Sequence, residues 1–257
     1  MISPISAIWR KDIKGFLTQP MFYMVVGMFL VLLATLFTFQ LYNFITQSFQ
    51  VMANDRAASG PNIYHHLIAN HIVITHYILV FVIAVLSLRF FSEEKKMKTF
   101  PLYLYSPIYS WQIVLGKWLV GATMVGVLLL ISAVYPLSLA FFIELPLTLI
   151  FLGYLGLFLI LCLYMSAALL ASALTDSLIV CVVLALVFNL TILLLGAGRE
   201  FTDLEVLQSF FSFVSIDYHF GFFKKGVLNV ASFFYLLSFS FFLSLVTERI
   251  IESHKWR

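Results

Sequence analysis

Residues 72–99 read IVITHYILVFVIAVLSLRFFSEEKKMKT. The apolar part, 72–91, is about as long as an α-helix must be to cross roughly 30 Å of hydrocarbon, which takes about 20 residues. The remainder, 92–99, carries two glutamates and three lysines. Charged groups are costly in hydrocarbon, so we expect this segment to sit in water on one fixed side of a bilayer.

The composition of the whole chain agrees with a membrane protein. Of its 257 residues, 62% are hydrophobic and 11% are charged, and the mean hydropathy is +1.03. Soluble domains average about 45–50% apolar and about 25% charged residues. The chain is therefore predicted to be an all-α polytopic membrane protein. A net charge of +3 is too small to indicate nucleic acid as a partner, and Cys162 and Cys181, both in apolar runs, are expected to be buried.

Apolar runs predict six membrane helices. Their expected bounds are 21–41, 72–91, 113–142, 147–174, 178–195 and 227–246. The third and fourth exceed the bilayer thickness, so they should tilt or project from it, and Pro136 should bend the third near one end. The first run is longer than the apolar core of a cleaved signal peptide, about 7–15 residues, so we expect it to remain as a helix.

The distribution of lysine and arginine predicts the orientation. Six helices put both chain ends on one side, with eleven of these residues there and four on the other side. The four are Arg56, Arg199, Lys224 and Lys225. Both termini and residues 92–112 are therefore expected in the cytoplasm, and residues 199–226 outside.

The segments outside the six helices carry two further patterns. Residues 3–19 place six apolar side chains on one helical face, and Ser3-Pro4 is typical of a helix start. The six are Ile5, Ile8, Trp9, Ile13, Phe16 and Leu17. This predicts an amphipathic helix in the cytoplasmic headgroup layer, with Trp9, Arg10 and Lys11 at the interface. Its role is open between an anchor that sets topology and a docking surface for a partner.

The outer segment 199–226 mixes four acidic residues with many large apolar ones. We expect one or two short helices that dip into the outer leaflet and are covered by protein where their ends need hydrogen bonds. Phe210, Phe211 and Phe213 are candidates for an outer gate. The alternative is a loosely packed outer loop.

Inside the predicted helices, small residues indicate close helix packing, and there are few polar groups that could bind or transfer ions. The fourth helix has a small-residue surface, and Asn189 in the fifth should donate an interhelical hydrogen bond. No helix has Asp, Glu or Lys at its centre, which argues against an ion-coupled secondary transporter. The small residues are Gly153, Gly156, Ala167, Ala168, Ala171, Ser172 and Ala173.

Sequence motifs for catalysis are missing. Gly116-Lys117 is followed by Trp118 and lacks the earlier glycine of a phosphate-binding loop, and neither H-E-x-x-H nor G-x-S-x-G occurs. We therefore expect no enzyme activity, no catalytic residue and no resident cofactor. His65, His66, His71 and His76 lie close in sequence, but the last two are roughly 140° apart around a helix, so interfacial histidines are expected rather than a metal site.

Two parts of the sequence resemble a known protein family. An amphipathic N-terminal helix followed by Arg89…Ser92-Glu93-Glu94-Lys95…Thr99…Pro107…Gly116-Lys117 resembles the ABC-2 type permeases, with a type V exporter-like fold. One departure is Lys98, which stands where the family has glycine, with Pro101 soon after. The C-terminal part resembles the gliding-motility-associated branch in Phe210…Phe213…Tyr218-His219-Phe220…Phe223…Lys225-Gly226-Val227 and Glu248-Arg249…Glu252-Ser253-His254-Lys255-Trp256.

The resemblance implies one permease domain over 1–257 in a bacterial inner membrane. ATP and Mg²⁺ would bind a separate cytoplasmic ABC ATPase, which would contact the N-terminal helix and the segment of Glu93, Glu94, Lys95, Lys98 and Thr99. The glutamates would pair with basic groups of the ATPase, and the lysines with acidic groups or anionic lipid. A second permease subunit, identical or related, would complete the path, and the gliding branch implies a partner with a large extracytoplasmic domain.

Several alternatives stay open. One is that the charged segment is only a solvated loop on the positive-inside side. Another is that the chain serves a copper-enzyme maturation exporter of the same ABC-2 type. A third is a non-transporting membrane scaffold through which ATP hydrolysis moves an extracytoplasmic partner, while an intramembrane enzyme has the least support.

Overall fold

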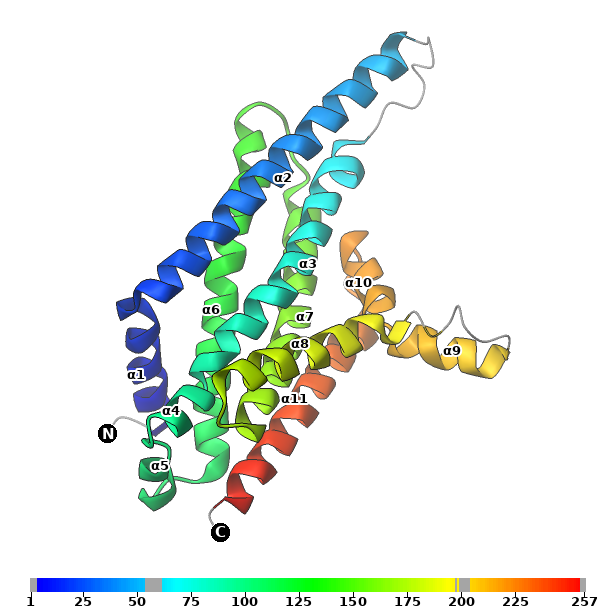
Figure 1. The fold of residues 1–257 in the computed structure, drawn as a ribbon. Coiled ribbons are helices and arrows are strands. Elements are labelled where there is room, and N and C mark those ends of the chain that lie inside the picture. The colour runs from blue at the N-terminus through cyan, green and yellow to red at the C-terminus, as the bar shows by residue number, and fades with distance from the viewer. Residues whose placement is uncertain (1–3, 54–61, 197, 199–203, 255–257) are drawn as a thin grey trace.

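The computed structural model describes residues 4–53, 62–196, 198 and 204–254. Every regular element in these ranges is helical, as the composition predicts. Parts of three expected segments (residue 3, residues 199–203, and Lys255 with Trp256) lie outside the described residues. Figure 1 shows an elongated bundle of long helices, with α9 projecting sideways from it.

The order of the helices follows the apolar runs. The long elements are α1 (Pro4–Thr18), α2 (Pro20–Ala53), α3 (Ala69–Leu86), α6 (Ser110–Ser138), α7 (Leu147–Leu174), α8 (Leu178–Leu194) and α11 (Val230–Ser253). The short ones are α4 (Ser92–Lys96), α5 (Pro101–Tyr105), α9 (Glu205–Val214) and α10 (Ile216–Lys224). A π-helical turn, Tyr64–Ile68, precedes α3, and a 3₁₀ turn, Ser87–Arg89, follows it.

Helix α7 forms the centre of the bundle. It packs against α3, α6, α8, α10 and α11, and most of its second half is buried. The small residues predicted for close packing do allow close approach, because a Cβ at Gly156 would overlap Phe223 of α10, and one at Gly153 would meet Ile72 at 2.8 Å. The fourth predicted helix has the same bounds as α7, and both cysteines are buried as expected.

Within the described parts of the chain, five helices are long and apolar enough to cross a membrane: Pro20–Val51, Tyr64–Lys96, Ser110–Phe141, Leu147–Leu174 and Val230–Ser253. The predicted fifth span corresponds to α8. Its 17 residues rise about 26 Å at 1.5 Å per residue, which is less than the hydrocarbon core of about 30 Å. A sixth full crossing is therefore not supported by length. The first span is longer than predicted, because α2 runs on for 34 residues through polar positions beyond residue 41.

The outer segment contains two helices in its described part. Helix α10 packs on α7 and buries Phe220 and Phe223. His219 joins α9, α10 and α11: its Nε2 lies 2.7 Å from the Phe213 carbonyl and its Nδ1 lies 2.9 Å from the Ser232 hydroxyl. His219 is fixed in this way to both neighbours. The depth of α9 and α10 in a bilayer stays a prediction.

Two histidines correct the expectation of an interfacial location. His71 and His76 are fully buried in α3. His71 Nε2 lies 3.3 Å from the carbonyl and the hydroxyl of Ser132 in α6, and His76 Nε2 lies 3.0 Å from the Tyr164 hydroxyl in α7. Each ring therefore links α3 to a neighbouring helix. Asn189 donates to the Val80 carbonyl at 3.4 Å, as the predicted interhelical donor.

One end of the bundle collects α1, α4, α5 and the end of α11 (Figure 1). The Phe100 ring before α5 contacts the His254 ring after α11, with 6.0 Å between centroids. We call this region the charged end, because it holds all seven ion pairs found among the described residues.

Candidate functional site

The candidate site begins with the contact between α1 and α6. Ile8 and Phe16 of α1 are buried, as their place on the apolar face predicts. A Cβ on Gly116 of α6 would lie 3.0 Å from the Ile8 side chain. Glycine at this position therefore lets α1 lie directly on α6, and the predicted amphipathic helix packs against protein with part of its apolar face.

Lys117, the next residue of α6, lies at the centre of the site. Its side chain is 0% exposed, and its Nζ is 2.8 Å from Glu94 Oε2 and 3.1 Å from Asp12 Oδ2. The ammonium also lies over the Phe91 ring, 5.0 Å from its centroid. A buried ammonium is tolerated only when it is paired, and two carboxylates, one from α1 and one from α4, meet that need here.

A second ammonium completes the arrangement. Lys11 Nζ lies 3.0 Å from Glu94 Oε1 and donates to the Tyr103 hydroxyl at 2.7 Å, and that hydroxyl donates to Glu94 Oε1 at 3.0 Å. We call Lys11, Asp12, Glu94, Tyr103 and Lys117 the charge cluster. Its two lysines and two acids balance, so four charges are brought together with no net charge.

The charge cluster shifts the pKa of its members outside the membrane helices. Burial disfavours the charged form of Lys11, but the bond to Tyr103 and the attraction of Glu94 outweigh it and raise the pKa of Lys11 above its usual value. Burial raises the pKa of Tyr103, and Glu94 adds to the rise. Lys11 therefore stays charged and Tyr103 stays protonated at neutral pH.

Arg89 fastens the other end of α1. Its Nη2 donates to the Gly15 carbonyl at 3.1 Å, its Nε pairs with Glu93 Oε2 at 3.2 Å, and its guanidinium stacks on the Phe16 ring at 4.6 Å. The Gly15 carbonyl is among the last of α1, where a cation is favourable. Glu93 also accepts from Gln19 at 3.4 Å.

Beyond the ion pairs the chain turns sharply. The amide of Thr99 donates to the Glu94 carbonyl at 2.9 Å, and that of Lys98 donates to the Lys95 carbonyl at 3.0 Å. These two bonds form a Schellman motif, in which the turning residue has positive φ. Lys98 has φ 57°, so this lysine adopts the left-handed conformation that glycine favours. Pro101 begins α5, a position that suits it.

The predicted coupling residues divide into buried and exposed groups. The sequence predicted a segment wholly in water; that prediction is wrong for Glu94 and for Lys95, which pairs with Asp176 at 3.3 Å and has a 6% exposed side chain. The cause is pairing, because opposite charges from α1, α6 and the α7–α8 connection neutralise them. Lys96, Met97, Lys98 and Thr99 are exposed, and we call them the exposed turn.

A cleft lies beside the exposed turn. It has a volume of about 750 Å³ between α1, α4 and α5. Its lining includes charged groups of the charge cluster together with several apolar side chains. The residues outside the charge cluster include Ala7, Gly15, Met97, Thr99, Leu102 and Ile108. The cleft is large enough to take the side chains of a docked helix or loop.

The remaining candidates lie apart from this cleft. Trp9 is half-buried, and Arg10 is exposed on α1. Phe210 and Phe213 on α9 are 59% and 57% exposed, at the segment that projects sideways in Figure 1. Phe211 is half-buried, close to Gly198. The structure does not bring these rings to the charged end.

Sequence reasoning missed the partners of Lys117. Asp12 and Tyr103 were not candidates, and Lys117 was noted only as part of a motif. A signal was present, because a lysine inside an apolar run needs a carboxylate partner, and Asp12 is the one acid in the N-terminal helix. Among the described residues, no three His, Cys, Asp or Glu side chains gather as metal ligands would.

Comparison with known proteins places this architecture in a family. Residues 6–251 match the model of the ABC-2 family transporter proteins, a region that holds both the bundle and the charge cluster. No curated relative matches the chain. Members of the family are transmembrane components of ABC transporters rather than the ATPase, which agrees with the several long apolar helices. The chain is a multi-pass membrane protein that belongs to the ABC-2 transporter family.

Proposed function

We propose that this chain is the membrane-spanning permease subunit of a transporter driven by a separate cytoplasmic ABC ATPase, and that the ATPase docks at the charged end. The observation that carries the proposal is the charge cluster. It ties three elements, α1, α4 and α6, to one buried ammonium, that of Lys117. A force applied at the exposed turn is thereby passed to a long helix of the bundle.

The charged end also has a surface suited to a protein partner. The exposed turn presents two lysines, Lys96 and Lys98, beside the 750 Å³ cleft. Because Glu93 and Glu94 already have partners in this chain, the lysines are better suited than the glutamates to pair with the ATPase. ATP and Mg²⁺ would be held by that partner.

The orientation and assembly follow from the same reasoning. The excess of lysine and arginine at the charged end favours a cytoplasmic location, with both termini on that side of a bacterial inner membrane. A second permease copy, or a related subunit, would complete the complex. We place it in the gliding-motility-associated branch, as an exporter or as a machine that transmits movement to an extracytoplasmic partner; the resemblance of residues 210–227 supports this.

Purification from native membranes tests the proposal. The tagged chain, extracted in mild detergent, should bring down a stoichiometric ATPase with a phosphate-binding loop and vanadate-sensitive activity. Any further subunit, identified by mass spectrometry, would separate a gliding-type complex from a copper-maturation exporter. A chain that purifies alone, without hydrolysis, under conditions that keep known ABC complexes together would contradict the proposal.

Charge reversal then tests the docking surface. Lys96→Glu and Lys98→Glu should each reduce the amount of co-purified ATPase and its stimulation by the permease, while the amount of chain in the membrane stays the same. Lys225→Glu, at an exposed lysine after α10, is the matched control and should keep the ATPase. Equal recovery of ATPase with all three variants would rule out the exposed turn as the docking surface.

A further inference from the structure

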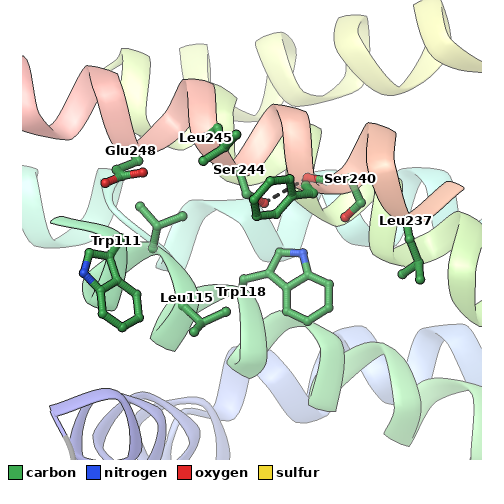
Figure 2. A pocket seen from close by; sticks show the side chains of 10 residues that line it. Trp111, Leu115, Trp118, Leu237, Ser240, Ser244, Leu245 and Glu248 are labelled. Carbon is green, nitrogen blue, oxygen red and sulfur yellow. Dashed lines mark hydrogen bonds between the residues drawn. The ribbon is translucent and has the colours of Figure 1, made fainter. Parts of the chain in front are cut away.

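An apolar groove lies between α6 and α11, apart from the cleft at the charged end. Its volume is about 390 Å³, and seven of its ten lining residues are apolar. Trp111, Leu115 and Trp118 line it from α6, and Leu237 and Leu245 are among those from α11 (Figure 2). Leu115, Leu245 and Trp111 are 39%, 42% and 47% exposed, so the groove is open on the side of the bundle.

The serine hydroxyls of the groove and the Trp118 indole make hydrogen bonds within the protein, whereas the Glu248 carboxylate makes none with the described residues. The Ser240 hydroxyl bonds that of Ser166 at 2.6 Å, and Ser244 donates to the Ser240 carbonyl at 3.0 Å. Trp118 Nε1 donates to Ser166 at 2.9 Å. Glu248 is half-buried and has no ion pair or hydrogen bond with any residue that the structure describes. A ligand of the groove would therefore meet one free carboxylate.

The position of Glu248 shows which end of the groove lies at the charged end of the bundle. Glu248 and Trp111 lie together at one end, and Leu237 lies at the other (Figure 2). Trp111 is the second residue of α6, and Glu248 lies near the end of α11, so this is the charged end. Tryptophan is typical of the membrane interface, and its ring attracts cations.

The length of the groove fits one leaflet. From Leu237 to Glu248, α11 rises about 16 Å at 1.5 Å per residue, roughly half of the hydrocarbon core of about 30 Å. A helix would be a poor occupant, because it is about 10 Å across with its side chains, and this volume would hold only about one turn. A single acyl chain, running from the interface to the bilayer centre, suits both the shape and the lining.

We propose that this groove binds an aminophospholipid of the leaflet at the charged end, with one acyl chain between α6 and α11 and the ammonium of the head group paired with Glu248. The carboxylate accepts hydrogen bonds from a primary ammonium, and the ring of Trp111 faces the same charge. Phosphatidylethanolamine meets these requirements. Phosphatidylcholine has no N–H to donate, and phosphatidylglycerol has no cation.

Native mass spectrometry of the full-length chain in detergent tests this with three lipids that share the same acyl chains. Phosphatidylethanolamine should bind about tenfold more tightly than phosphatidylglycerol, a ratio expected for one charge-assisted hydrogen bond at a partly exposed site, with phosphatidylcholine between them. Equal affinity for the three lipids would overturn the proposal.

Two variants with matched controls locate the site. Glu248→Gln should remove the preference for phosphatidylethanolamine, whereas Glu252→Gln, one turn further along α11 and paired with Arg249, should keep it. Leu115→Trp should fill the groove and weaken all three lipids, whereas Leu130→Trp, at a 72% exposed position of the same helix, should not. A preference that survives Glu248→Gln would contradict the assignment.

A third variant tests for the other occupant considered, a second copy of the chain. Leu245→Cys places a thiol in the groove, and the two native cysteines are buried. Oxidation in membranes should leave this variant uncrosslinked, because lipid covers the site. A disulfide-linked pair of chains would show that a second copy fills the groove, and would overturn the lipid assignment.

Discussion

Lys117→Met is the substitution that most directly tests the charge cluster. Methionine keeps most of the length of the side chain but removes the ammonium. Among the partners in the described parts of the chain, Glu94 would then keep Lys11 and Tyr103, and Asp12 would keep Lys11, at 3.8 Å. Both carboxylates are at most 13% exposed, so neither would regain full hydration.

The expected cost follows from this burial. Removing one partner of a buried ion pair typically destabilises a protein by about 3–5 kcal/mol, because the other charge is left uncompensated. Lys11 still offsets part of the negative charge here, so we expect the lower end, about 3 kcal/mol. Replacing all three groups, as Asp12→Asn, Glu94→Gln and Lys117→Met together, should cost less than Lys117→Met alone, since no buried charge is then stranded.

Equilibrium unfolding in mixed detergent micelles measures the difference. Lys14→Met is the matched control, because Lys14 is an exposed lysine on α1 whose side chain has no ion pair among the described residues, and it should leave the unfolding midpoint unchanged. A Lys117→Met variant within about 1 kcal/mol of the native protein would refute the reasoning, since a buried, doubly paired ammonium cannot be that dispensable.

Three further predictions concern the backbone and the outer helices. Lys98→Gly should raise the free energy of unfolding by about 0.5–1 kcal/mol, because φ 57° is costly for a side chain with Cβ. Gly156→Ala should lower the free energy of unfolding by about 1–3 kcal/mol, because the added Cβ overlaps Phe223. Gly27→Ala is the control and should not lower it, because no atom lies within 4 Å of the Cβ it adds. Equal effects of the two substitutions would contradict the packing of α7 on α10. Burial lowers the pKa of His219. Its stabilising contribution is therefore complete above the unfolded pKa of about 6.5 and is lost as the pH falls below that value. Between pH 7.5 and pH 5.5, the thermal unfolding temperature should fall more for the native protein than for His219→Gln.

The bounds of a helix could be predicted from the sequence where the apolar run and the helix begin or end at the same residue. Pro146 precedes α7, and Thr175 follows it in extended conformation, so the apolar run and the helix end together. In α2 they do not, because Asn43, Thr46 and Gln47 lower the hydropathy but do not break a helix. Polarity marks where a span ends more clearly than where a helix ends.

The charge cluster could be predicted only in part, because its members are far apart in the chain. Asp12 and Lys117 are separated by 105 residues, and nothing in their local sequences indicates that they meet. From the sequence, the whole charged segment 92–99 was expected to sit in water. Tertiary pairing divides it instead into a neutralised base, Glu94 with Lys95, and an exposed turn that begins at Lys96.

This division has a mechanical consequence for a permease worked by an external motor. Separating α1 or α4 from α6 would strand at least one charge of the charge cluster in a buried site, at a cost of several kcal/mol, so these three elements should move as one body. The outer face of α2 has no such constraint: Met24, Met28 and Phe39 are 74%, 67% and 62% exposed. Movement that enters at the exposed turn would therefore pass along α6, and the relative displacement would occur where α2 meets its neighbours through apolar contacts and through the hydrogen bond from the Tyr135 hydroxyl of α6 to the Leu30 carbonyl, at 2.9 Å.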